Sequence, residues 1–306
     1  MESVHLSTIA ERMNHVFSNI ILPLNIALIM FGMGLSVNKD DFIRVFRQPR
    51  TVVTGLAAHL IILPLVAFLL VVFLPIHPAV KVGLMLIAAC PDGTTANLVN
   101  YWVKGNVALC LTLTVLLSFI ILITLPLIVK GSLSLFFGKT IGFIPLPLGE
   151  TILNVALVVL IPVISGLWVK SRYPRFAAKV EKPLETVLSV LLFFVYIAVI
   201  VIEQKTGTTT WRGYLSIFWL ALALNQVAML ASYILAKKFV KDNRDSVTIA
   251  MQVGLQNSAL AIYVATSLLK NPGIAVVAVV YGSFSFFTTL LFGYFAKKRG
   301  NTPTAV

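Results

Sequence analysis

The chain has 306 residues, of which 58% are hydrophobic and only 11% are charged, and its mean hydropathy is +0.96. A soluble domain carries about 25% charged residues, so this composition excludes a water-soluble protein and indicates an integral protein of the lipid bilayer. The net charge of +13 does not indicate binding to nucleic acid, because the basic residues lie in short segments between apolar runs rather than on one face.

Nine apolar runs are long enough to cross a bilayer, which takes about 20 residues. In chain order they are Phe17–Val37, Thr51–Leu74, Ala79–Val103, Asn106–Val129, Thr151–Val169, Leu184–Ile202, Tyr214–Ala236, Ser246–Leu269 and Ile274–Ala296. The residues before the first run hold two acids and one arginine, unlike the basic start of a cleaved signal peptide, so we expect this run to stay as a helix. Residues 1–306 are therefore predicted to form a single membrane domain.

The distribution of basic residues predicts the orientation. If the N-terminus lies outside, seventeen of the 24 Lys and Arg residues fall in the inner loops and the C-terminal tail. Lys and Arg accumulate on the cytoplasmic side of membrane proteins. We therefore predict a multi-pass protein with its N-terminus outside and its C-terminus in the cytoplasm, in the inner membrane if its source is bacterial.

The third run is interrupted by "CPDGTTANLVN", Cys90–Asn100. Pro91 lacks a backbone donor, and Gly93 lets the backbone leave helical geometry. Inside a membrane, irregular backbone is tolerated only where it is buried in protein or lines a wet cavity. The stretch therefore predicts a discontinuous helix whose broken ends face a binding site. The polar side chains beside these ends are Thr94, Thr95 and Asn97.

The eighth run is interrupted in a similar way by "MQVGLQNSALA", Met251–Ala261. Its polar or helix-breaking residues are Gln252, Gly254, Gln256, Asn257 and Ser258. Two interrupted spans in corresponding halves of a chain indicate the site of a transporter built from inverted repeats. Small and polar residues also serve as packing surface and as hydrogen-bond partners between helices. We favour that interpretation for Gly32–Gly34, Asn225 and Gln226, but not for the two long stretches.

Two ionisable side chains lie within predicted spans. A carboxylate such as Asp92 costs roughly 2.5–3.5 kcal/mol at membrane depth, which makes it a functional candidate. Asp92 can instead cap the second half-helix, and the two roles can coexist. His59 is either a hydrogen-bond donor between helices or a site residue or proton carrier. Cys90 and Cys110 both lie inside predicted spans, so a disulfide framework is not expected.

Other function classes have less support in the sequence. The chain has no Ser/His/Asp spacing, zinc-type cluster or phosphate-binding loop, so we do not expect an enzyme. A channel would carry a filter motif, and none is recognisable. A receptor-like membrane protein, which would bind its ligand without moving it, remains an alternative.

Three stretches resemble the bile acid/sodium symporter family, solute carrier family 10. They are "IMFGMGLSVNKDDF" (Ile29–Phe42), "CPDGTTANLVNYWVKGNVALCLTLT" (Cys90–Thr114) and "VGLQNSALA" (Val253–Ala261). The resemblance implies an all-α fold of inverted repeats, here with nine transmembrane helices because the first of the family's ten is missing. It also implies panel helices at about 17–74 (first part) and 151–202, and core helices at about 51–129 and 214–296, with the two discontinuous helices crossing in the core.

The family's substrates are organic anions, so the resemblance implies a transporter that moves a small organic anion by alternating access. We expect a monomer without a cofactor other than sodium ions. The residues expected to contact the anion are Asp92, Thr94, Thr95, Asn257 and Ser258.

The resemblance also maps two sodium sites onto the chain. The corresponding positions are His59, Asn97, Cys110, Thr114, Gln252, Val253, Leu255 and Gln256, the last four flanking the second interruption. Four positions depart from the family pattern, namely Ala96, Cys110, Gln252 and His59, and Gln252 stands where the family has a Glu. Asp92, where the family usually has Gly, returns a charge to the region.

Sodium is a hard cation that prefers oxygen ligands. The departures therefore predict sodium coupling that is weak or lost, with proton-coupled or uncoupled transport of the anion as alternatives. An arsenite-type efflux permease with Cys90 as its thiol is a further, weaker alternative.

Overall fold

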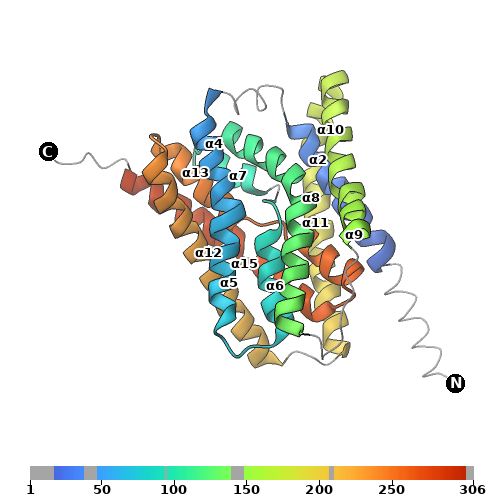
Figure 1. The fold of residues 1–306 in the computed structure, drawn as a ribbon. Helices are drawn as coiled ribbons and strands as arrows, with labels where there is room; N and C mark the ends of the chain where they lie inside the picture. The colour runs from blue at the N-terminus through green and yellow to red at the C-terminus, as the bar shows by residue number, and fades with distance from the viewer. Residues whose placement is uncertain (1–16, 38–46, 94, 139–147, 207–209, 301–306) are drawn as a thin grey trace.

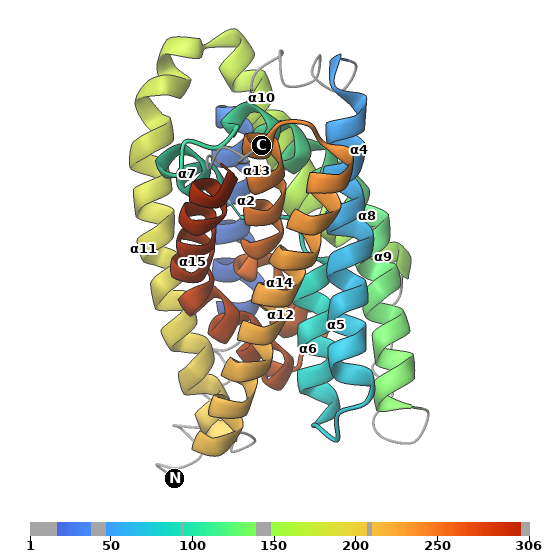
Figure 2. The same cartoon turned by 90° about the vertical axis from the view of Figure 1, so that its left-hand side faces the viewer.

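The computed structural model describes residues 17–37, 47–93, 95–138, 148–206 and 210–300. These residues are almost entirely helical, and most helices run along one common axis (Figures 1 and 2). The α-helices are α2 Leu22–Ser36, α4 Pro49–Ala57, α5 Leu63–Val72, α6 Pro78–Ala89, α7 Thr95–Trp102, α8 Val107–Phe137, α9 Leu148–Val155, α10 Ile161–Arg172, α11 Pro174–Thr206, α12 Trp211–Phe239, α13 Asn243–Gly254, α14 Ser258–Tyr263 and α15 Pro272–Gly300. Four five-residue π-helical segments continue some of them, η1 Phe17–Ile21, η2 Ala58–Ile62, η3 Ala156–Leu160 and η4 Val264–Leu268.

Proline accounts for three of the π-helical segments. Pro23, Pro64 and Pro162 each stand second in the α-helix that follows such a segment. Proline cannot donate to the carbonyl four residues earlier, so the preceding turn widens to the π spacing instead of ending the helix. The chain can therefore carry proline within a span and still satisfy its backbone.

Six helical segments in the described part of the chain are long and apolar enough to cross a membrane. They are Asn19–Ser36, Pro49–Val72, Val107–Phe137, Gly149–Arg172, Trp211–Phe239 and Pro272–Lys298. Large apolar side chains on their outer faces, such as Ile61, Ile234 and Phe287, are exposed in the isolated chain. Lipid is the solvent that suits such a surface, so the protein is an integral, multi-pass membrane protein.

Helix ends differ from the predicted spans where charged residues extend a helix. The sixth predicted span, Leu184–Ile202, lies within α11, whose apolar part is Val190–Val201. α8 likewise continues beyond Val129 to Phe137. Hydropathy shows which residues suit the hydrocarbon core of the bilayer, whereas a helix can continue beyond that core into the polar interfacial region.

One group of helices consists of α2, α10 and α11, which pack together (Figure 1). A Cβ atom on Gly34 would lie 2.2 Å from the carbonyl oxygen of Val163, and one on Gly166 would lie 2.2 Å from that of Phe31. Glycine at both positions therefore permits close contact between α2 and α10, as the packing interpretation of Gly32–Gly34 predicted.

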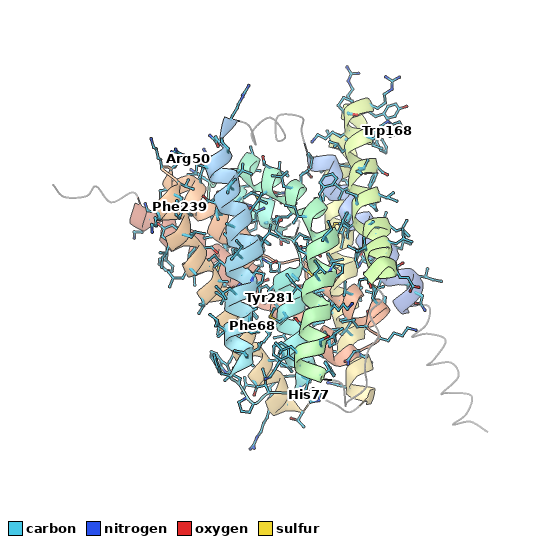
Figure 3. The ribbon with its side chains drawn as sticks, in the orientation of Figure 1. Arg50, Phe68, His77, Trp168, Phe239 and Tyr281 are labelled. Carbon is cyan, nitrogen blue, oxygen red and sulfur yellow. The ribbon has the colours of Figure 1, made fainter. Side chains whose placement is uncertain are left out.

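The remaining helices pack around the two interrupted spans. α12 contacts α5, α13 and α15, and α6 contacts α8 and α15. Figure 3 shows Arg50 and Trp168 at one end of the molecule, His77 at the other and Tyr281 between them, close to the interrupted helices.

Candidate functional site

The two interruptions meet each other. The third span is divided into α6 and α7, and the eighth into α13 and α14. The N–H of Gly93 donates to the carbonyl of Leu255 at 2.9 Å, and the N–H of Asn257 donates to that of Pro91 at 2.8 Å. These bonds make a short antiparallel bridge centred on Asp92 and Gln256. The irregular backbone of each helix is thus partly satisfied by the other, as a lipid environment requires.

Local sequence explains where the second interruption begins and ends. The side-chain oxygen of Asn257 accepts the N–H of Leu260 at 3.0 Å and caps α14. At the end of α13, the carbonyl of Gly254 accepts from Asn225 Nδ2 at 2.8 Å and from the hydroxyl of Tyr281 at 3.0 Å. The interpretation of Asn225 as a hydrogen-bond partner between helices is therefore confirmed.

Tyr281 was missed because a tyrosine in an apolar run looks like packing. It is fully buried, as is Asn225. Thr288 and Gln226 complete this group, since both donate to Asn225 Oδ1, at 2.9 and 2.8 Å. Their spacing along α15 and α12 gave no signal of a shared partner.

We call the place where the two interruptions meet, at Asp92 and Gln256, the crossing point. A cavity of about 680 Å³ lies beside it. Its walls come from α2 and α11 on one side and from the two interruptions, α14 and α15 on the other. The polar side chains that line it are Thr95, Tyr196, Gln256, Asn257, Ser258, Ser283 and Ser285, with the hydroxyl of Tyr196 interacting with the side chain of Ser258. Its apolar lining includes Ile29, Leu192, Phe193, Ile197, Ile200, Val279, Phe286 and Phe287.

Three of the residues predicted to contact an anion line this cavity, namely Thr95, Asn257 and Ser258. Asn257 Nδ2 is buried and has no hydrogen-bond partner among the described residues. None of the described lining residues is charged. The prediction for Thr94 falls outside the described residues.

Asp92 is not among the described residues that line this cavity, although it was predicted with the anion-binding residues. Its side chain is fully buried, and the hydroxyl of Thr114 on α8 donates to Asp92 Oδ2. Asp92 Oδ1 has no hydrogen-bond partner in the described part of the chain. The structure therefore places the carboxylate with the residues that the sequence assigned to cation binding.

Gln252, on α13, contacts the same Thr114 hydroxyl that donates to Asp92. Its Nε2 donates to the carbonyl of Cys110 at 3.0 Å and to Thr114 Oγ1 at 3.2 Å, while its Oε1 is buried without a partner. On α7, Asn97 Oδ1 is also buried and unpaired, and Ala96 belongs to the same apolar cluster as Cys110. The Cys110 thiol accepts from Asn100 Nδ2 at 3.4 Å.

His59 occupies a different part of the crossing point. His59 Nε2 is 3.2 Å from Gln256 Oε1, and Gln256 Nε2 donates to the carbonyl of Val253 at 2.7 Å. His59 therefore joins the helix that contains η2 to the second interruption. Cys90 is buried at the end of α6 and is not among the described residues that line the cavity.

Comparisons with known proteins find sequence relatives among transporters. The chain is 30% identical over 274 residues to the uncharacterized sodium-dependent transporter YocS of Bacillus subtilis, which covers 89% of the chain and 82% of that relative. It is 29% identical over 261 residues to the probable chloroplastic sodium/metabolite cotransporter BASS2 of Oryza sativa subsp. japonica, covering 85% of the chain but only 60% of that relative. It is 25% identical over 290 residues to the ileal sodium/bile acid cotransporter of Cricetulus griseus, covering 93% of the chain and 81% of that relative.

A model of the sodium bile acid symporter family matches residues 23–210, which is more than half of the chain. The match includes the first interruption and all of α11, while the second interruption lies beyond it. Together with the relatives, this match shows that the chain belongs to the sodium bile acid symporter family.

Proposed function

We propose that the protein is a secondary transporter that moves organic anions across a membrane by alternating access. The observation that carries this proposal is the meeting of two interrupted membrane helices beside a cavity of about 680 Å³. Interrupted helices place polar groups at mid-membrane, where a transported molecule must pass. Family membership supports a transporter.

The proposed topology has nine crossings, with the N-terminus outside and the C-terminus in the cytoplasm. Six long apolar helices, the two interrupted spans and α11 supply these crossings. We take α2, α10 and α11 as the panel and the helices around the crossing point as the core, related as inverted repeats. The cavity lies between the two groups, so movement of core against panel opens it to one side and then to the other.

Neutral donors suit an anion in this cavity. Asn257 Nδ2 is buried and unpaired, and Asn257 lines the same cavity as Ser258 and Thr95. A buried donor without a partner costs free energy that a ligand oxygen recovers. Apart from the hydroxyl of Tyr196, the opposite wall is apolar and includes Phe193, Ile197 and Ile200, so the substrate we propose has an anionic head and an apolar body.

The relatives' names fit this substrate class. They include sodium/metabolite and sodium/bile acid cotransporters and a sodium-dependent organic anion transporter of Homo sapiens. The proposal keeps the prediction that sodium coupling is weak or lost. That prediction rests on Ala96, Cys110, Gln252 and His59, which depart from the family's ligand pattern.

A substitution at Asn257 tests the anion site without removing the helix cap. Asn257→Asp keeps an oxygen that caps α14 but replaces the free Nδ2 donor with an acceptor. We expect it to weaken binding of organic anions at least tenfold, measured as the ligand-induced rise in Tm of purified protein. Asn271→Asp is the matched control, because Asn271 accepts the N–H of Ile274 at the start of α15, away from this cavity.

The same variants are then compared in proteoliposomes by anion exchange in symmetrical salt. Unchanged affinity and exchange in Asn257→Asp would contradict the anion site. Binding of anions without any exchange would indicate a receptor instead of a transporter.

A further inference from the structure

Buried oxygens near the crossing point fall into two sets, one unpaired and one already paired. We propose that the protein binds one sodium ion against the carboxylate of Asp92, and that the oxygens around His59 and Gln256 no longer form a second site. This inference rests on the proposed function as a transporter. It replaces the prediction that sodium coupling is weak or lost with a more specific one, that anion transport is coupled to a single sodium ion.

The first set has the composition of a cation site. Asp92 Oδ1 and Gln252 Oε1 are both buried without a partner among the described residues, in side chains that are 0% and 1% exposed. Thr114 Oγ1 joins the two side chains, since it donates to Asp92 Oδ2 and accepts from Gln252 Nε2. Asn97 Oδ1 is a further unpaired buried oxygen, on the helix that follows Asp92.

The charge of Asp92 calls for a cation. Among the described residues, the groups that interact with its carboxylate are the side chains of Thr114, Gln252 and Cys110 and the Asp92 backbone, and none of them is a cation. A buried carboxylate is stabilised when it is protonated, paired or bound to a metal ion. The unpaired Oδ1 and the neighbouring amide and hydroxyl oxygens favour a bound cation here. Sodium, which favours several oxygens and at least one negative charge, fits this set.

Gln252 adapts to the ion by turning its amide. Its Nε2 donates to the carbonyl of Cys110 and to the hydroxyl of Thr114. A rotation of 180° exchanges Nε2 and Oε1, which presents an oxygen to the same space. A neutral Gln at this position therefore supplies a ligand without a charge, and Asp92 supplies the charge from the other interrupted helix.

The second set does not fit a sodium ion. Gln256 Oε1 lies 3.2 Å from His59 Nε2. Gln256 Nε2 donates to the carbonyl of Val253 at 2.7 Å, and the N–H of Gly93 donates to the carbonyl of Leu255 at 2.9 Å. His59 contributes nitrogen atoms in place of an oxygen. A cation here would have to break bonds that hold the crossing point together.

Sodium binding is measured on purified protein as the rise in Tm with increasing NaCl, with choline chloride holding the ionic strength constant and KCl as the competing cation. We expect a saturable rise that is selective for sodium and fits one site. Asp92→Asn should raise the apparent Kd for sodium at least tenfold. Asp245→Asn is the matched control. Asp245, on α13, is also a buried acid, but its Oδ1 accepts a hydrogen bond from Asn106 Nδ2 at 2.7 Å.

A second variant tests whether Asp92 binds sodium or only holds the fold together. It moves the carboxylate from position 92 to position 252 on α13. The double variant Asp92→Asn/Gln252→Glu has a carboxylate on the opposite side of Thr114, so it should regain sodium-dependent stabilisation that Asp92→Asn lacks. Recovery in the double variant would exclude simple misfolding of Asp92→Asn. Unchanged sodium affinity in Asp92→Asn, or no sodium-selective rise in the unaltered protein, would overturn the proposal.

The number of ions is tested with radioactive sodium at saturation and with the Hill coefficient of the Tm titration. One bound ion and a Hill coefficient of about 1 are expected, and two ions in the unaltered protein would overturn the loss of the second site. Anion exchange in symmetrical salt separates this proposal from the proposed function. Exchange without sodium binding contradicts only the sodium site, and sodium binding without any anion binding or exchange contradicts only the transporter proposal.

Discussion

Asp92 and Gln256 lie opposite each other as an antiparallel backbone pair at the point where two membrane helices are broken. The flanking bonds, Gly93 to Leu255 and Asn257 to Pro91, satisfy two donors and two acceptors that the breaks would otherwise expose. Water is scarce at this depth, and an unsatisfied backbone group costs several kcal/mol. Each interruption therefore stabilises the other, and their pairing joins the third span to the eighth.

We predict that the local backbone at position 93 tolerates a side chain, whereas the cavity beside it does not. A Cβ atom there would meet its nearest neighbours at 3.6 Å, an ordinary contact, and Gly93 is not among the positive-φ glycines. Gly93→Ala should therefore change Tm little but lower anion affinity roughly tenfold, because the new methyl group enters the cavity. Binding is measured by ligand-induced thermal shift.

Gly83→Ala is the contrasting variant for this experiment. A Cβ on Gly83 would lie 2.6 Å from Val277 Cγ2 and 2.8 Å from the carbonyl of Ile274. It should destabilise the packing of α6 against α15 by about 1–3 kcal/mol, which lowers Tm. A large loss of Tm in Gly93→Ala would show instead that the interruption requires glycine.

The carbonyl of Gly254 is predicted to depend on two donors jointly. Tyr281→Phe and Asn225→Leu each remove one donor to this carbonyl and leave the other. Tyr281→Phe should cost about 1 kcal/mol, and Asn225→Leu should cost more, because Thr288 and Gln226 also lose their acceptor. The double variant leaves a buried carbonyl without these donors and should cost more than the sum of the single changes. Tm measured in a fixed detergent reports these differences.

Tyr294→Phe is the control for the loss of a tyrosine hydroxyl. Tyr294 lies on α15 with Tyr281, but its side chain is 61% exposed. It should leave Tm unchanged. Strictly additive effects of Asn225 and Tyr281 would contradict a shared partner.

The orientation is tested with a thiol reagent that cannot cross membranes. Cys90 and Cys110 are buried, so the unaltered protein should react little. Tyr173→Cys, between α10 and α11, and Trp211→Cys, at the start of α12, introduce thiols at exposed positions on opposite ends of the molecule (Figure 1). Intact cells should label Trp211→Cys, and Tyr173→Cys should react only after the membrane is permeabilised. The reverse pattern would contradict the predicted orientation.

The sequence by itself determined the class of protein and the positions of the two interruptions. Both are local properties. Long apolar runs are compatible only with lipid, and Pro91 with its polar neighbours, or Gln252–Ser258 in mid-span, cannot continue as plain membrane helix. The motifs around these interruptions also predicted the family, which the comparisons confirm.

Only the tertiary structure decided which partners these residues have. Asp92 was grouped with the anion-binding residues because it adjoins them in sequence, but its carboxylate faces Thr114 on α8. Tyr281 and Asn225, 56 residues apart, share the carbonyl of Gly254. Side-chain direction in irregular backbone is set by whichever helix packs against it, and neither hydropathy nor spacing along the chain encodes that neighbour.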